Sequence, residues 1–299
     1  MEKPQVDVQK ILQFQTEEHE DIFTSRDAIL YALSLGYNQD PLNEKELAFT
    51  YELHENFKVF PTFACVLPKM DIFKALLDCP GLPQFNPMML LHGEQRFEQY
   101  RPLVPDTKYI TVTKVADVAD KGKGMLLTLE ALSYEQTENN QRILAFKNTM
   151  SLFIRQLGGF GYKGKNLPQI PKKPTRQPCA VVQEKTRPNQ ALLYRLNGDY
   201  NPLHIDPNMA SMGGFDKPIL HGMCFYGLMT KAVLGKFCDD DVNLIQSVQA
   251  RFTSHVFPGE NLEFSLWKDG NKVFASGSTQ ERKIECIQGI IEIKEKAKL

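Results

Sequence analysis

The sequence of 299 residues has few of the features that mark specialised protein classes. It has no excess charge, because 35 lysines and arginines balance 36 acidic residues. This balance excludes a surface built as a whole to bind nucleic acid or an anionic membrane. The six cysteines form no CxxC pair, which argues against a disulfide framework or a zinc site and favours a reducing compartment. The six histidines have no metal-ligand spacing, so we expect no bound metal.

Two further absences concern whole segments. No secretory apolar core follows the N-terminus, and no GxGxxG motif follows a predicted strand, which disfavours a dinucleotide-binding dehydrogenase. The most apolar long segment, residues 219–237, is interrupted by His221 and Lys231. We therefore expect a buried helix there and no membrane span. The composition, with 42% hydrophobic and 24% charged residues, is that of a soluble globular protein.

An internal repeat organises the chain. Residues 28–41 (AILYALSLGYNQDP) align without gaps with residues 191–204 (ALLYRLNGDYNPLH). The alignment puts Asp199 opposite Gly36 and His204 opposite Pro41. One copy therefore keeps the framework and lacks both titratable groups.

The surroundings of the two copies predict the architecture. An apolar run follows each copy, at 58–67 and at 217–228, and strand-like segments separated by turn residues come next. A helix that is apolar on most sides needs burial on most sides, which a curved antiparallel sheet supplies. We expect an α+β fold of two half-domains, 1–157 and 179–299, each a long helix wrapped by such a sheet. Residues 158–178, rich in Gly, Pro and Lys, read as the linker.

The segment 198–204, GDYNPLH, holds a candidate catalytic pair. Residues five apart on a continuous helix point to different faces. Here Asn201 is a good N-cap and Pro202 suits the first helical position. Asp199 then lies in the loop and His204 in the first turn, so both can face one pocket. The alternative is an ordinary turn with a solvent-facing histidine.

Gly222 lies where the long apolar helix is expected to begin. The free N–H groups at a helix N-terminus carry partial positive charge. Without a side chain, Gly222 leaves its N–H open to a carbonyl oxygen, which suits an oxyanion site for an enolate. The alternative is that this glycine only lets the helix pack closely.

Residues 191–227 closely resemble the signature of the (3R)-specific 2-enoyl-CoA hydratases. This hydratase 2 group of MaoC-like proteins includes the hydratase part of peroxisomal multifunctional enzyme type 2. The Gly-Asp-x-Asn-Pro-Leu-His core carries the likeness, together with Leu-His-Gly starting sixteen residues beyond His204, and it extends across most of the chain. The resemblance implies a double hot-dog fold. It also implies a non-catalytic, acyl-chain-binding first half and chemistry in the second half.

The resemblance also assigns roles to residues. Asp199 and His204 become the catalytic pair, with Asn201 beside them and the Gly222 N–H on the thioester oxygen. Either member of the pair can be the base. The substrate contacts that it implies are His92, Gly93, Lys121, Tyr200 and Phe252. Of these, His92 and Phe252 can equally be structural, and Lys121 can be a solvated turn lysine.

The expected reaction is syn addition of water to a trans-2-enoyl-CoA, which gives a (3R)-3-hydroxyacyl-CoA in fatty-acid β-oxidation. Such a hydro-lyase needs no cofactor, because coenzyme A is part of the substrate. Two alternatives stay open: an acyl-CoA thioesterase on the same fold and a non-catalytic acyl-CoA binder. The binder would not explain the intact Asp, His and Gly set.

Partners and location follow from the same likeness and from the last three residues. Family likeness implies a homodimer. Ala297, Lys298 and Leu299 resemble the tripeptide that the peroxisomal import receptor reads. We therefore expect a peroxisomal protein that binds this receptor, or a cytosolic protein if the tripeptide is not read.

Overall fold

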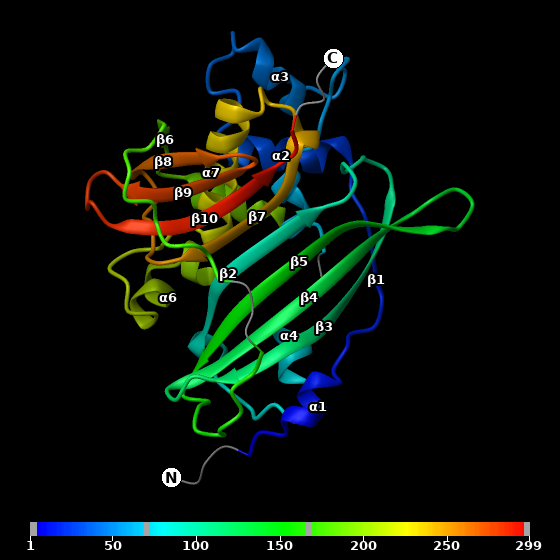
Figure 1. Cartoon of the computed structure of the whole chain (residues 1–299), viewed down its shortest axis with the longest axis vertical. Helices are drawn as coiled ribbons and strands as arrows, with labels where there is room; N and C mark the ends of the chain where they lie inside the picture. The colour runs from blue at the N-terminus through cyan, green and yellow to red at the C-terminus, as the bar shows by residue number, and fades with distance from the viewer. Residues whose placement is uncertain (1–4, 69–71, 166–168, 296–299) are drawn as a thin grey trace.

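The computed structural model describes residues 5–68, 72–165 and 169–295. Within them the strands form one antiparallel sheet (Figure 1). In chain order the strands are β1 (His19–Ile22), β2 (Leu90–Gln99), β3 (Lys108–Asp120), β4 (Gly124–Gln136), β5 (Arg142–Arg155), β6 (Ala180–Lys185), β7 (Ile245–Phe252), β8 (Asn261–Asp269), β9 (Lys272–Thr279) and β10 (Glu285–Ile293). Across the sheet they run β1-β3-β4-β5-β2-β7-β10-β9-β8-β6. Each half of the chain therefore builds its own block of neighbouring strands.

The two blocks meet where β2 pairs with β7. The antiparallel register runs from Glu94 opposite Arg251 to Glu98 opposite Ser247. The Arg251 Nη2 lies 2.6 Å from the Glu94 Oε1 across this seam. Each block thus covers a strand edge that the other would leave open.

The helices lie around and against the sheet, and α7, with 16 residues, is the longest of those described. The described residues form α1 (Val8–Leu12), α2 (Ser25–Ser34), α3 (Glu44–Thr50), α4 (Ile72–Leu77), α5 (Gln190–Tyr194), α6 (Pro207–Met212) and α7 (Gly222–Phe237). They also form the 3₁₀ helices η1 (Pro61–Cys65), η2 (Pro87–Met89), η3 (Arg195–Asn197), η4 (Pro202–His204) and η5 (Val242–Leu244). None of the helices in this part of the chain is both long and apolar enough to cross a bilayer.

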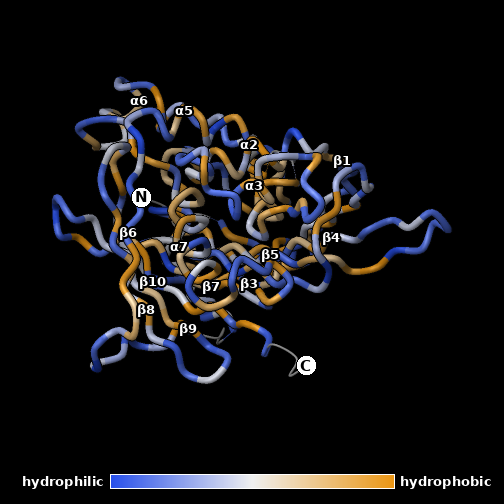
Figure 2. The backbone as a smooth tube through the Cα atoms, turned by 90° about the horizontal axis from the view of Figure 1, so that it is seen from above, coloured by the Kyte–Doolittle hydropathy of each residue, from blue (hydrophilic) through white to orange (hydrophobic). Residues whose placement is uncertain are grey.

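Helix α7 is the buried helix that the apolar segment predicts. It lies against the second block of strands (Figure 1), and its buried hydrophobic side chains belong to the main hydrophobic cluster. The Tyr226 hydroxyl donates to the Val248 carbonyl at 2.8 Å and so ties the helix to β7. In Figure 2 the colour marks hydrophobic residues over much of α7 and over parts of the strands beside it. The prediction of a buried helix in the second half is confirmed.

The first half differs from the expectation, because residues 58–67 form no long helix. Only Pro61–Cys65 is helical, as the short 3₁₀ helix η1. Pro68 explains the early end, since a proline disfavours helical geometry at the residue before it. The apolar run is still buried, and Phe63 and Ala64 lie in the main cluster. A second cluster of the first half packs between α4 and strands β3 to β5.

The two copies of the repeat pack against each other. The rings of Tyr31 and Tyr194, which are equivalent in the repeat, lie 5.9 Å apart. Ser34 and Asn197 are also equivalent, and the Asn197 Nδ2 donates to the Ser34 Oγ at 3.0 Å. Equivalent residues meet in this way when two copies are related by a local two-fold axis. The repeat in the sequence is therefore a repeat in space.

The first part of the predicted linker lies against the first half of the chain. The Asp120 carboxylate accepts the N–H groups of Gly159 and Gly161, at 3.0 and 2.6 Å. The Lys165 N–H donates to the Asp117 carboxylate at 2.9 Å. The boundaries at residues 157 and 179 stay a prediction.

Candidate active site

The loop that carries Asp199 begins at a glycine. Helix η3 ends at Asn197, and Gly198 adopts a φ of +124°, which side-chain-bearing residues rarely reach. The Asp199 Oδ1 then accepts the Asn201 N–H at 3.2 Å. The chain is thus turned sharply just before the carboxylate.

The break between Asp199 and His204 is built as the sequence predicts. The Asn201 side chain accepts the Leu203 N–H at 3.0 Å, and Pro202 opens the helix that follows. That helix, η4, is a single 3₁₀ turn ending at His204. The N-cap prediction for Asn201 is confirmed.

His204 is buried, with 8% of its surface exposed. Its Nδ1 lies 2.8 Å from the Ile219 carbonyl oxygen. A carbonyl only accepts, so Nδ1 carries the proton and the neutral ring keeps its lone pair on Nε2. Burial lowers the pKa of His204, while the nearby charge of Asp199 and the bond to Ile219 act in the opposite direction. The lowered pKa favours the neutral imidazole above about pH 6.5, with Nε2 as its basic nitrogen.

His221 completes the group and was not singled out as a site residue from the sequence. One side-chain ligand atom each of Asp199, His204 and His221 lie within 4.8 Å of one another. His221 is the N-cap of α7, its ring stacks on that of His204 at 3.7 Å, and its Nε2 lies 3.2 Å from the Asp199 carbonyl oxygen. Its place directly before Gly222 is the signal that could have found it.

This group of three is the one set of described side chains close enough to hold a metal ion. The two imidazole planes are stacked and differ by only 27°. The ring nitrogens therefore lie in two nearly parallel planes, whereas the lone pairs of metal ligands converge on one point. The geometry favours proton transfer over chelation.

Gly222 is the first residue of α7, so its N–H has no acceptor within the helix. A Cβ added at Gly222 would lie 3.3 Å from the Phe252 Cε1. This contact supports the close-packing interpretation. The free N–H keeps the oxyanion interpretation open as well.

Phe252 and His92 form a wall of the same region. Their rings make an edge contact at 5.4 Å, and His92 comes from β2 in the first half. The His92 Nε2 is 3.1 Å from the Gln95 Oε1. Burial lowers the pKa of His92, partly offset by this bond and by the charge of Asp199. Gly93 lies at an irregularity in the β2–β5 register, where a Cβ would be 3.4 Å from the Ser151 carbonyl oxygen.

Tyr200 and Lys121 are less closely joined to this group. The Tyr200 ring is exposed and lies under the Arg195 guanidinium, 4.9 Å away. Lys121 occupies the turn between β3 and β4, where its N–H donates to the Gly124 carbonyl at 2.9 Å. The structure brings together Asp199, His204, Asn201, Gly222, Phe252 and His92, and their roles stay predictions.

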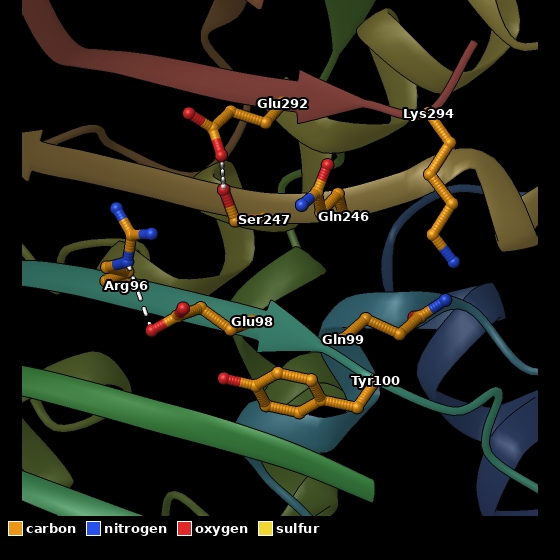
Figure 3. Close-up of a pocket in the computed structure, with 8 residues that line it drawn as sticks. All are labelled: Arg96, Glu98, Gln99, Tyr100, Gln246, Ser247, Glu292 and Lys294. Atoms are coloured by element: carbon orange, nitrogen blue, oxygen red, sulfur yellow. Dashed lines mark hydrogen bonds and ion pairs between the residues drawn. The ribbon is translucent and has the colours of Figure 1, made fainter.

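Two surface cavities lie elsewhere. A polar cavity of about 340 Å³ follows the β2–β7 seam, where Arg96 points toward Glu98 and Ser247 toward Glu292 (Figure 3). Another, of about 460 Å³, lies beside Phe257 and Arg282. Neither is lined by a predicted site residue.

Known proteins resemble the chain over nearly its whole length. Residues 22–156 match the family model "MFE-2 hydratase 2 N-terminal domain", and residues 169–289 match the "MaoC like domain". The chain is 39% identical to a probable enoyl-CoA hydratase 2 of Dictyostelium discoideum, over 91% of this chain and 95% of the relative. It is also 39% identical to the peroxisomal enoyl-CoA hydratase 2 of Arabidopsis thaliana, over 91% and 90%.

Solved structures confirm the fold class. The crystal structure of a MaoC-like dehydratase from Phytophthora capsici superposes with a TM-score of 0.87 at 36% identity, covering 98% of this chain and 99% of that one. A conserved Mycobacterium tuberculosis protein with a double hotdog fold superposes with a TM-score of 0.53 at 12% identity, covering 98% and 96%, and bears on the fold alone. The prediction of a double hot-dog is confirmed.

Proposed function

Because the chain belongs to the hydratase 2 family of MaoC-like proteins, we propose that it adds water to trans-2-enoyl-CoA thioesters. The product is a (3R)-3-hydroxyacyl-CoA, as in fatty-acid β-oxidation. The observation that carries this proposal is the meeting of Asp199 and His204 beside the first N–H of α7. Groups within 4.8 Å of each other can share one water through two hydrogen bonds of about 2.8 Å.

The tautomer of His204 supports a division of labour within the pair. Since Nδ1 carries the proton, Nε2 is the atom that can accept one. In the proposed step the water oxygen bonds to C3 while His204 Nε2 takes a water proton. The C2–C3 π pair moves toward the thioester oxygen and forms an enolate. The Asp199 carboxylate accepts a hydrogen bond from the other O–H of that water and orients it, and this hydrogen stays on the oxygen as the 3-hydroxyl group.

The second step returns the proton. The His204 imidazolium donates it to C2, on the face from which the oxygen added, so water has added syn and the enzyme is restored. The Gly222 N–H donates to the enolate oxygen in between. Removal of one such donor costs about 3 kcal/mol in the transition state.

The first half, residues 1–157, is proposed to hold the acyl chain without taking part in the chemistry. Two observations support this. Gly36 and Pro41 stand where the second half, residues 179–299, has its acid and base. His92 and Phe252, from opposite sides of the seam, make contact beside the pair.

The remaining proposals concern location and assembly. Relatives with enoyl-CoA hydratase 2 and multifunctional enzyme names are called peroxisomal, which supports a peroxisomal location. We propose import through Ala297, Lys298 and Leu299, which lie outside the described residues. We also propose that the protein is a homodimer. It is proposed to need no cofactor, because coenzyme A is part of the substrate.

The test is hydration of crotonyl-CoA and longer enoyl-CoA esters by the purified chain. Hydration removes the enoyl absorbance without releasing thiol, and chiral analysis gives the 3R product. Release of free thiol would identify a thioesterase instead. Binding without either change would identify an acyl-CoA binder.

A further inference from the structure

His221 has no role in the mechanism above, yet it is the most buried polar residue of the site, with 1% of its surface exposed. Burying an imidazole costs free energy that an apolar side chain would not. Its contacts go to both members of the proposed pair. The ring stacks on His204 at 3.7 Å, and Nε2 lies 3.2 Å from the backbone oxygen of Asp199.

The protonation state of His221 follows from these contacts. The Asp199 carbonyl only accepts, so Nε2 of His221 carries the hydrogen and Nδ1 the lone pair. Nδ1 is buried and has no hydrogen-bond partner among the described residues. Burial lowers the pKa of His221 to about 3, and the neighbouring His204 acts in the same direction. His221 is therefore neutral over the pH range in which a histidine normally titrates.

A neutral ring in this place suits its neighbour. A second cation stacked on His204 would oppose the charge that His204 gains when it takes a proton. The charged and titratable groups that face this site from the surrounding elements are Asp199, Arg195, Tyr194 and His92. His221 adds no charge to these groups. It contributes a ring that packs on His204 and one N–H donor.

The first half of the chain provides an internal comparison. Aligning the apolar runs at 58–67 and 217–226 places Thr62 opposite His221. The Thr62 hydroxyl bonds to that of Tyr31 at 2.8 Å, while Tyr194, the equivalent of Tyr31, lies 5.0 Å from the His221 ring. The half without the acid and base thus has a threonine where the other half has an imidazole.

We propose that His221 is a positioning residue that fixes Asp199 and His204 relative to each other. Its N–H holds the backbone of the Asp199 loop, and its ring supports one face of His204. Asp199 and His204 are thereby both held in place by the His221 side chain at the start of α7. This inference rests on the proposed hydratase function, since it concerns the same site.

Two variants separate the two contacts. His221→Phe keeps a ring against His204 and removes the N–H, whereas His221→Gln keeps an amide N–H near the position of Nε2 and removes the ring. Both are expected to lower kcat roughly 10- to 100-fold, with KM unchanged, because small displacements of reacting groups are costly. Thr62→Val is the matched control, since it removes a buried hydrogen bond at the equivalent place and should leave kcat unchanged.

The pH profile of kcat distinguishes positioning from a merely structural role. In His221→Phe the Asp199 loop is released, so its charge no longer raises the pKa of His204 and the acidic limb moves to lower pH. In His221→Gln the limb stays where it is. If both variants keep the wild-type kcat per folded molecule and the wild-type profile, the proposal is overturned.

An activity-independent measurement keeps this inference separate from the proposed function. NMR titration of the His204 ring reports its pKa in wild type and in His221→Phe, whatever reaction the protein catalyses. A lower pKa in the variant supports positioning even if crotonyl-CoA is not hydrated. An unchanged pKa overturns it even in an active hydratase.

Discussion

At the scale of single residues, the buried imidazoles of His204 and His221 and the half-buried one of His92 lie near the Asp199 carboxylate. The sequence pointed to Asp199 and His204 because Gly198, Asn201 and Pro202 dictate a break between them. The sequence did not identify His221 as a site residue, because a histidine inside an apolar run is interpreted only as a polar interruption of a buried helix. Its contact with the Asp199 backbone depends on a loop 22 residues earlier in the chain. Spacing along the sequence carries no trace of that approach.

The proposed acid–base pair predicts a large loss of turnover on small changes. Asp199→Asn and His204→Gln should each lower kcat by roughly 10²- to 10⁴-fold, because each removes a proton-transfer or water-orienting group. The measurement is loss of crotonyl-CoA absorbance, with circular dichroism to verify the fold. Asp206→Asn is a matched control, since Asp206 only caps α6 and asparagine caps equally well. Near-normal hydration by either site variant would refute the pair.

The same imidazoles predict a loss of stability in acid. Burial lowers the pKa of His92, His204 and His221 in the folded chain. The unfolded chain binds protons below about pH 6.5, while the folded chain resists protonation. The free energy of unfolding is therefore unaffected by these histidines above about pH 6.5 and decreases as the pH falls below that value. For His221 the decrease continues down to its pKa in the folded chain, about 3.

Urea unfolding at several pH values measures this effect. The free energy of unfolding should fall by up to about 1.4 kcal/mol per pH unit for each such histidine. His221→Gln should flatten the dependence. A wild-type profile that is flat between about pH 6.5 and 5 would contradict the burial of these neutral rings.

At the scale of elements, the long apolar segment predicted α7 well because sixteen residues without proline can form four turns. The prediction of a long helix in the corresponding run of the first half was wrong, and Pro68 gives the reason. The apolar composition of the two runs correctly predicted that both are buried. It did not give helix length, because the backbone restriction of one proline outweighs the hydrophobic pattern around it.

Two glycines of α7 predict opposite responses to alanine. A Cβ at Gly227 would lie 2.7 Å from the buried Leu35 Cδ2, so Gly227→Ala should destabilise by about 1–3 kcal/mol. Gly235 is exposed and its nearest atom would be 3.6 Å away, so Gly235→Ala should stabilise by up to about 1 kcal/mol. Thermal unfolding measures both. Equal effects would contradict the packing of α7 against the first half.

At the scale of the whole molecule, the halves share one sheet and one main hydrophobic cluster. The internal repeat made a two-part architecture predictable from the sequence. The strand order at the seam could not be predicted from the repeat, since antiparallel neighbours leave no pairing signal in composition or spacing.

This sharing predicts that neither half folds alone. Residues 179–299 expressed without the first half expose β7 and the face of α7 that meets Leu35. We expect no cooperative thermal transition, and recovery of a soluble, active complex on co-expression with residues 1–178. A monomeric 179–299 fragment with full hydratase turnover would argue against the shared core.

The contact between Ser34 and Asn197 also bears on how such a chain changes over generations. Asn197 directly precedes the glycine that aims the carboxylate, and its amide rests on a hydroxyl from the copy without acid or base. A change at Ser34 is therefore expected to disturb the loop that carries Asp199. We therefore expect substitutions at Ser34 and Asn197 to be tolerated in combination better than singly.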